Sequence, residues 1–238
     1  MRPNNFLTMK KILNLLAMKI SLLLLTFLPI FYFAQMDTDR PGEGTASTII
    51  SPKTIQLESG IIYNRSEKGF TSDHLLRLGL TERWEVRLQT IQDLSDSSES
   101  TYGFSSKYNF FKGEDYAPSL TLIADSDFKF EDYSFIIASD KQLTENFGSS
   151  AGTGFVKEDG ENFYFLSLGL DYSFTDRLAI FTEYYGYFNY NLSPEHGVDF
   201  GLTYLAAPRL QLDVSVGTNP QNISADYYLS TGISYRFR

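Results

Sequence analysis

Large and small side chains alternate with a period of two along most of the chain after residue 54. Between Tyr164 and Phe174 every second residue is leucine, tyrosine or phenylalanine, and the residues between them are mostly serine, glycine or aspartate. Leu210–Val216 alternates in the same way. Because successive side chains of an extended strand point to opposite faces, this period predicts β-strands. No window of this region keeps a helical period, so the pattern predicts an all-β protein.

Turn signals divide the alternating segments at regular intervals. The turns that begin at Thr81, Lys112, Thr144, Thr175 and Ala206 are separated by 31 or 32 residues. A repeat of this length fits a hairpin of two strands of about ten residues, one short turn and one longer loop. The other connections, such as "SEKGFTSD" and "KEDGEN", are acidic or polar and are predicted to be the longer ones. The segments predict twelve strands, at residues 54–64, 73–80, 84–92, 101–111, 118–126, 131–143, 147–156, 162–174, 178–189, 196–205, 209–217 and 225–237.

Two folds compete for these strands. In a soluble β-sandwich or jelly roll the apolar face would point to a core and the polar face to water. Three features favour a membrane barrel instead: a second face rich in glycine, serine and threonine, aromatic residues near strand ends, and short turns that alternate with longer loops. In hydrocarbon every backbone donor must pair internally, so the sheet must close. The sequence therefore predicts a transmembrane antiparallel up-and-down β-barrel of about 12 strands over residues 54–238, whose last strand pairs with its first.

The first 34 residues have the organisation of an export signal. Basic residues precede the apolar run Ile20–Phe33, which is followed by Ala34. The run has 14 residues and contains Pro29, whereas a membrane-spanning helix needs about 20 apolar residues. We therefore predict a cleaved signal peptide at residues 1–34; the alternative is a membrane anchor.

The net charge and the cysteine content limit the kinds of partner that the protein can bind. Residues 1–34 hold four of the 20 basic residues and none of the 29 acidic ones, so their removal leaves a net charge of −13. This balance disfavours nucleic acid, and the absence of cysteine excludes disulfides. We expect a protein of the outer membrane of a Gram-negative-type bacterium. Its expected partners are outer-membrane lipid and lipopolysaccharide, the barrel-assembly machinery and a small-molecule solute.

The segment from Thr38 to Tyr63 reads "TDRPGEGTASTIISPKTIQLESGIIY". Its Thr-Asp-Arg-Pro box, its Pro-Lys pair and its Gln-Leu-Glu-Ser-Gly strand resemble the opening of one barrel family, the outer-membrane transporters associated with the meta-cleavage pathway of phenol degradation. The resemblance covers most of the chain after the signal, and it implies a barrel of transporter type without naming a solute. Residues 35–53 precede the first strand, and either a periplasmic lead-in or a plug inside the lumen fits them.

If the aromatic and aliphatic face points outward, the charged residues point into the lumen. Basic residues then lie on strands 2, 3, 4 and 12, and strands 5 to 11 contribute only acids. A basic arc that faces an acidic arc would set a transverse field across a pore. The alternative is a lumen blocked by ion pairs among neighbours such as Glu58, Arg77 and Arg87. The candidate pore-lining belt consists of Arg77, Arg87, Lys107, Asp140, Asp171, Glu183 and Asp213, with Arg236 at the closing seam.

Four further lumen residues are aromatic: Phe165, Tyr185, Tyr187 and Tyr228. They are candidates to stack on aromatic solutes, and packing filler is the alternative reading.

Enzymatic chemistry is not expected. The only histidines are His74 and His196, and neither has an evident serine partner at strand spacing. A barrel phospholipase would need a serine–histidine pair held by a third group. Two histidines without cysteine also disfavour a zinc site, and no cofactor-binding motif is present. We expect a channel or transporter for small solutes, aromatic or hydrophobic ones among the candidates; the alternative is a non-conducting structural or adhesion barrel.

Overall fold

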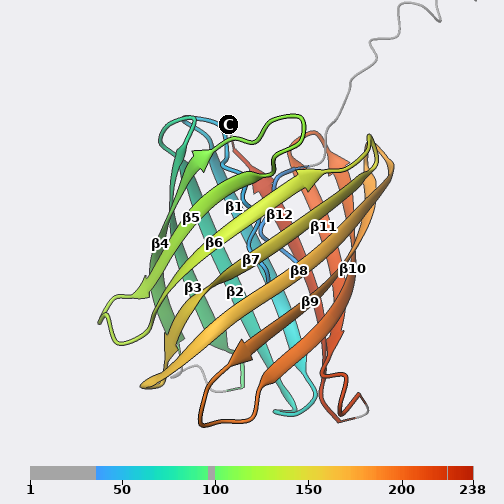
Figure 1. The fold of residues 1–238 in the computed structure, drawn as a ribbon. Helices are drawn as coiled ribbons and strands as arrows, with labels where there is room; N and C mark the ends of the chain where they lie inside the picture. The colour runs from blue at the N-terminus through green and yellow to red at the C-terminus, as the bar shows by residue number, and fades with distance from the viewer. Residues whose placement is uncertain (1–35, 96–99, 224, 238) are drawn as a thin grey trace, which may run out of the picture. The chain divides into compact units, whose positions relative to one another are not determined.

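A computed structural model describes residues 36–95, 100–223 and 225–237. It confirms a closed antiparallel barrel of twelve strands, each paired with its chain neighbours (Figure 1). The strands are β1 (Ile55–Asn64), β2 (Gly69–Gly79), β3 (Trp84–Asp93), β4 (Ser100–Phe111), β5 (Ser119–Asp127), β6 (Tyr133–Gln142), β7 (Phe147–Glu158), β8 (Glu161–Thr175), β9 (Leu178–Phe188), β10 (Glu195–Ala207), β11 (Leu210–Thr218) and β12 (Tyr227–Arg236). Within the described residues, no helix is long and apolar enough to cross a membrane.

The last strand closes the barrel on the first, as predicted. β12 pairs antiparallel with β1 in a register that sets Gln56 opposite Arg236 and Tyr63 opposite Leu229. The amide of Phe237 donates to the carbonyl of Ile55 at 2.9 Å and continues the seam to the end of the described chain. Closure removes the two sheet edges, whose unpaired backbone groups hydrocarbon would not tolerate.

The connections differ from the prediction at two places on one end of the barrel. β2 begins at Gly69 instead of residue 73, so only four residues, 65–68, join it to β1. This turn is tight because the side-chain oxygen of Asn64 accepts from the Ser66 amide at 3.1 Å and Lys68 adopts a φ of 54°. β7 and β8 are joined by Asp159–Gly160 alone, with φ values of 50° and 81° that suit a two-residue hairpin. The longer loops predicted at both places are therefore wrong.

The two ends of the barrel differ in the connections that they carry, and we call them the turn end and the loop end. The turn end carries the connections after β2, β4, β6, β8 and β10 and the end of β12, and it is uppermost in Figure 1. The loop end carries the connections after β1, β3, β5, β7, β9 and β11.

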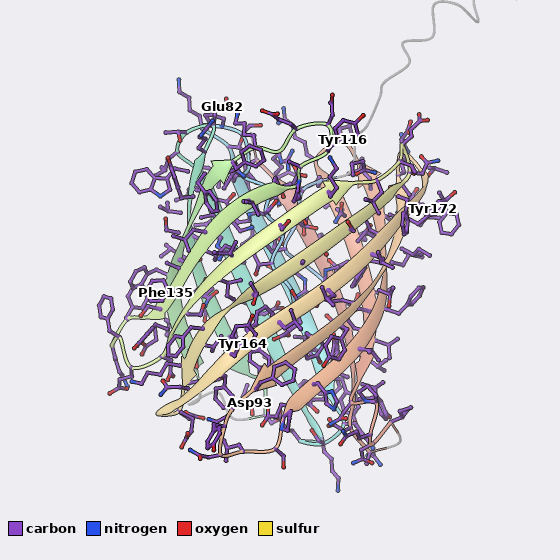
Figure 2. All side chains as sticks on the ribbon, viewed as in Figure 1. Glu82, Asp93, Tyr116, Phe135, Tyr164 and Tyr172 are labelled. Atoms are coloured by element: carbon purple, nitrogen blue, oxygen red, sulfur yellow. The ribbon has the colours of Figure 1, made fainter. Side chains whose placement is uncertain are left out.

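The barrel wall has its apolar side chains on the outside and its charged side chains on the inside, the reverse of a soluble protein. Side chains such as Phe135, Tyr164 and Tyr172 stand on the outer face, at 52%, 54% and 40% exposure (Figure 2). Fully buried Arg77 and Lys107 face the interior instead. Soluble proteins almost never bury such charges in place of their large apolar residues. The arrangement is that of an outer-membrane-type barrel with a lipid-facing wall and a polar lumen.

The segment before β1, Met36–Lys53, runs inside the barrel, where Figure 1 shows it in blue behind β6 and β7. Its amides bond to inward carboxylates of the wall, such as Glu58 and Glu183. Near the turn end it leaves the lumen through Lys53, whose amide donates to the carbonyl of Gly79 at 2.8 Å. We call Met36–Lys53 the luminal segment. The predicted signal peptide, residues 1–34, lies outside the described residues.

Candidate functional site: the charged lumen

All eight predicted belt residues lie on strand positions that alternate with the outward apolar residues. Their surroundings differ, because the luminal segment contacts some of them and leaves others apart. Arg77, Arg87, Lys107, Glu183 and Asp213 are buried, whereas Asp140, Asp171 and Arg236 are half-buried.

The basic arc converges on one residue of the luminal segment, Asp39. Lys107 Nζ and Arg87 Nη1 each lie 2.7 Å from an Asp39 carboxylate oxygen, and Arg77 Nη1 lies at 3.9 Å. Burial alone would raise the pKa of the Asp39 carboxyl, but Arg77, Lys107 and Arg87 outweigh it and hold the pKa well below its usual 3.8. Asp39 therefore stays ionised and neutralises part of the basic arc.

Arg77 is the centre of a second set of ion pairs within the wall itself. Its guanidinium lies 2.9 Å from Glu58 and 2.7 Å from Glu85, and all three side chains are fully buried. Arg87 pairs on its other side with Asp125 at 2.9 Å. The basic arc is thus compensated by wall carboxylates as well as by the luminal segment.

Arg40, which follows Asp39 in the chain, pairs with acids on β2 and β11, the strands that flank the closing β1–β12 seam. Its guanidinium contacts Asp73 of β2, reaches Asp213 of β11 at 3.3 Å and donates to Ser230 Oγ at 2.8 Å. It lies over the paired glycines Gly60 and Gly232, where any Cβ would collide with it. The absence of side chains at these two positions makes the space that Arg40 fills.

Other wall carboxylates bind the backbone of the luminal segment. Glu183 accepts the amides of Glu43 and Gly44 at 3.0 and 2.7 Å. Glu58 accepts those of Asp39 and Arg40 at 3.0 and 3.1 Å. In addition, Glu85 accepts the Ile50 amide at 2.9 Å, and Asp140 accepts the Ser47 amide. These bonds tie the main chain of the luminal segment to the four strands β1, β3, β6 and β9.

Two members of the predicted belt stand apart from this network. Asp171 lies beside Gly148 of the neighbouring strand, and Arg236 donates from Nε to Gln56 Oε1 at 2.9 Å. No hydrogen bond among the described residues joins either side chain to the luminal segment. The eight charges therefore do not act as one ring, because the luminal segment engages only part of them.

Asp39 and Arg40 are the lumen residues that the charge pattern of the strands did not reveal. They belong to the Thr-Asp-Arg-Pro box, whose resemblance to the family opening does not by itself predict a place in the lumen. Thr38 of this box holds the turn: its hydroxyl donates to the Arg40 carbonyl and accepts from Gln211 Nε2, both at 2.9 Å. The one sequence signal for this role was the pair of adjacent opposite charges, Asp39 and Arg40, in a segment without strand periodicity.

The four predicted aromatic residues gather towards the loop end of the lumen. Phe165 and Tyr187 lie with ring centroids 5.1 Å apart, and the Tyr187 hydroxyl donates to Glu43 Oε1 at 2.6 Å. Tyr185 and Tyr228 lie over glycines of the neighbouring strands. All four therefore pack against the lumen wall, and no solute is needed to hold them in place.

One sequence-based expectation about histidine is wrong. His74 does have a serine partner: its Nδ1 lies 3.0 Å from Ser59 Oγ, directly across the β1–β2 pair on the outer wall. Within the described part of the chain, no carboxylate or amide side chain bonds to the His74 ring. A nucleophile–base pair needs such a third group to orient the base, so this pair does not form a triad.

Comparison with known proteins identifies the family. The family model described as "Putative MetA-pathway of phenol degradation" matches residues 38–237. The chain belongs to this family. No curated protein sequence matches it.

Solved structures resemble this member of the phenol-degradation family in fold. The KdgM porin superposes with a TM-score of 0.63 at 13% identity over 77% of this chain and 99% of its own. The COG4313 outer membrane channel from Pseudomonas putida F1 has a TM-score of 0.58 at 9% identity over 83% and 99%. The NanC porin gives 0.57 at 10% identity over 76% and 98%. At these identities the likeness establishes the fold, that of outer-membrane barrels.

Proposed function

We propose that the protein is an outer-membrane channel for small solutes and that the luminal segment holds its lumen closed. The observation that carries this proposal is the division of charge within one dipeptide. Asp39 pairs with Lys107 and Arg87 of the basic arc, and Arg40 pairs with acids of β2 and β11, on either side of the closing seam. The segment thereby replaces the counterions that an open, charged pore would require.

The ion pairs of Asp39 and Arg40 favour a closed resting state, and the entry of water allows that state to open. Breaking a buried pair leaves an uncompensated charge and costs about 3–5 kcal/mol in a dry interior. In a barrel lumen water can enter as the segment leaves, and it hydrates Asp39, Arg40 and their partners. The free energy needed to open the lumen is then smaller than the summed energies of the broken ion pairs. This is what a luminal segment that moves out of the channel requires.

The choice of solutes follows from the family and from the lumen. Aromatic or hydrophobic small molecules are the proposed cargo because the family is associated with phenol degradation and the loop end of the lumen carries Phe165, Tyr185, Tyr187 and Tyr228. With the short turns placed in the periplasm, as in other outer-membrane barrels, solute would meet this aromatic region, which Glu43 of the luminal segment contacts, before it meets Asp39 and Arg40. Insertion by the barrel-assembly machinery and contact with lipopolysaccharide are part of the same proposal.

Single-channel conductance in planar bilayers tests the proposal. Residues 35–238, the chain expected after signal cleavage, should open rarely. A chain of residues 47–238 lacks Asp39, Arg40, Glu43 and Gly44 but keeps the stretch that leads into β1, and it should open steadily. If both chains fold to a heat-modifiable barrel and neither conducts, the channel proposal fails. If both conduct equally, the luminal segment does not close the lumen.

A further inference from the structure

The loop-end half of the lumen combines aromatic rings with acids in one place. Asp199 of β10 accepts a hydrogen bond from the Tyr228 hydroxyl at 3.0 Å. Glu43 of the luminal segment accepts a hydrogen bond from the Tyr187 hydroxyl at 2.6 Å, and Tyr185 lies on β9, opposite Gly197 of β10. We call Glu43, Tyr185, Tyr187, Asp199 and Tyr228 the aromatic–acid cluster.

One acid of the cluster has an unused acceptor. Asp199 is only 3% exposed, and its Oδ1 has no hydrogen-bond partner, although Oδ2 is held by Tyr228. A buried carboxylate oxygen without a donor is costly, so Oδ1 is available to a donor that a bound solute brings. Glu43 is exposed, so the cluster is open to solvent on its side.

No positive charge of the wall compensates these acids. The strands β8 to β11, which carry Tyr185, Tyr187 and Asp199, contain no lysine or arginine. Further acids stand at the same end, at Glu158, Glu195 and Asp226. Lys157 is directed away, since its Nζ bonds to the Glu131 carbonyl at 3.1 Å and lies over the ring of Tyr133. The remaining described basic residues at this end, Arg65, Lys68 and Lys129, lie on exposed connections between strands.

The tyrosine rings are held against the wall by glycines. A Cβ at Gly197 would collide with Tyr185, and a Cβ at Gly217 would collide with Tyr228, so each ring fills the place of a missing side chain on the next strand. Both tyrosines remain half-buried and partly accessible. A cation near a tyrosine ring is attracted by the negative face of the ring, more strongly as water is excluded.

We propose that the aromatic–acid cluster is a binding site for organic cations with an apolar body, such as protonated aryl or alkyl amines. The ammonium group donates to the free oxygen of Asp199 and is compensated by Asp199 and Glu43. The apolar body lies against the rings of Tyr185, Tyr187 and Tyr228. A bare metal ion fits less well, because among the described residues no three acidic or histidine side chains are grouped to hold one. This inference rests on the proposed function, since it names a class of solute for that lumen.

Binding rather than conductance tests the site, so that failure of the channel proposal does not decide it. The chain of residues 35–238, folded in a non-ionic detergent, is titrated with benzylammonium, benzyl alcohol and benzoate, and tyrosine fluorescence or calorimetry follows the binding. Benzylammonium should bind about tenfold more tightly than benzyl alcohol, which corresponds to about 1.4 kcal/mol, and benzoate should bind most weakly.

Two substitutions separate the site from general electrostatics. Asp199→Asn should abolish the preference for benzylammonium over benzyl alcohol, and Tyr185→Leu should weaken binding of both. Asp115→Asn removes the same charge from an exposed connection at the turn end and should leave all three affinities unchanged. Equal affinities for the three probes, or equal losses in Asp199→Asn and Asp115→Asn, would overturn the proposal. If Asp199→Asn does not fold, the probe comparison and Tyr185→Leu still decide it.

Discussion

Asp39 and Arg40 are adjacent in the chain, yet they pair with different sets of wall charges. Asp39 is held by Lys107 and Arg87 at 2.7 Å each, while Arg40 bonds to Asp213 at 3.3 Å and contacts Asp73. The two adjacent charges of the luminal segment are therefore each matched to wall charges of opposite sign. This match gives the wall charges a structural use that does not require an open pore.

Exchanging the two charges tests the match without changing composition or net charge. In Asp39→Arg/Arg40→Asp each charge would face like charges, which destabilises the segment in the lumen. We expect the open probability in planar bilayers to rise at least tenfold over the unchanged chain. A matched exchange in the exposed turn, Glu67→Lys/Lys68→Glu, should have no effect. An open probability equal to that of the unchanged chain would contradict the role of the pairs.

We predict that the missing side chain at Gly60 affects channel opening only because it leaves room for Arg40. In Gly60→Ala the new methyl group would meet the Arg40 guanidinium, a flexible group that can move, so the barrel should fold and Arg40 should lose its place. We expect more frequent openings, and Arg40→Ala should abolish the difference between glycine and alanine at residue 60. Gly69→Ala is the control, because its Cβ would come no closer than 3.6 Å to a side chain. A Gly60→Ala effect that persists without Arg40 would show that the glycine acts by another route.

Arg77 is expected to stabilise the barrel itself. In Arg77→Met two fully buried carboxylates, Glu58 and Glu85, lose their cation. Loss of one partner of a buried pair costs about 3–5 kcal/mol, so the midpoint of urea unfolding should fall markedly. Arg83→Met changes the same residue types in an exposed turn and should shift stability by about 0.5 kcal/mol or less. Equal midpoints for the two variants would mean that the Glu58–Arg77–Glu85 set contributes little.

The barrel could be predicted because period-two alternation fixes the face of each residue wherever one face must be apolar. That argument placed Arg77 and Glu183 inside and Tyr164 outside, as the structure has them. It says less about where a strand begins when polar residues surround a lone apolar one. In Gly69–Ser72 only Phe70 is large and apolar, so the pattern predicts a loop there, although these residues pair with β1.

Because the β1–β2 connection is shorter than the sequence predicts, the contact between His74 and Ser59 could not be predicted either. The cross-strand partner of a residue depends on the length of the turn, and only the four-residue turn at 65–68 sets His74 opposite Ser59. The sequence left open whether residues 35–53 form a periplasmic lead-in or a plug inside the lumen, for a different reason. The segment has no periodicity, and its partners on β2, β3, β4, β9 and β11 come together only when the barrel closes.

A reversible cross-link tests most directly whether the luminal segment closes the channel. A Cβ at Gly44 of the luminal segment would lie 3.0 Å from Ser167 Oγ of β8, and the chain has no cysteine, so Gly44→Cys/Ser167→Cys introduces the only pair. This cross-link holds the part of the luminal segment that the chain of residues 47–238 lacks. In a Gly60→Ala background, single-channel conductance is recorded first under oxidising conditions and then after a reductant is added to the same membrane. Ser167→Cys alone serves as the control. We predict no openings while the disulfide holds and frequent openings after reduction; the same open probability in both states would contradict the account.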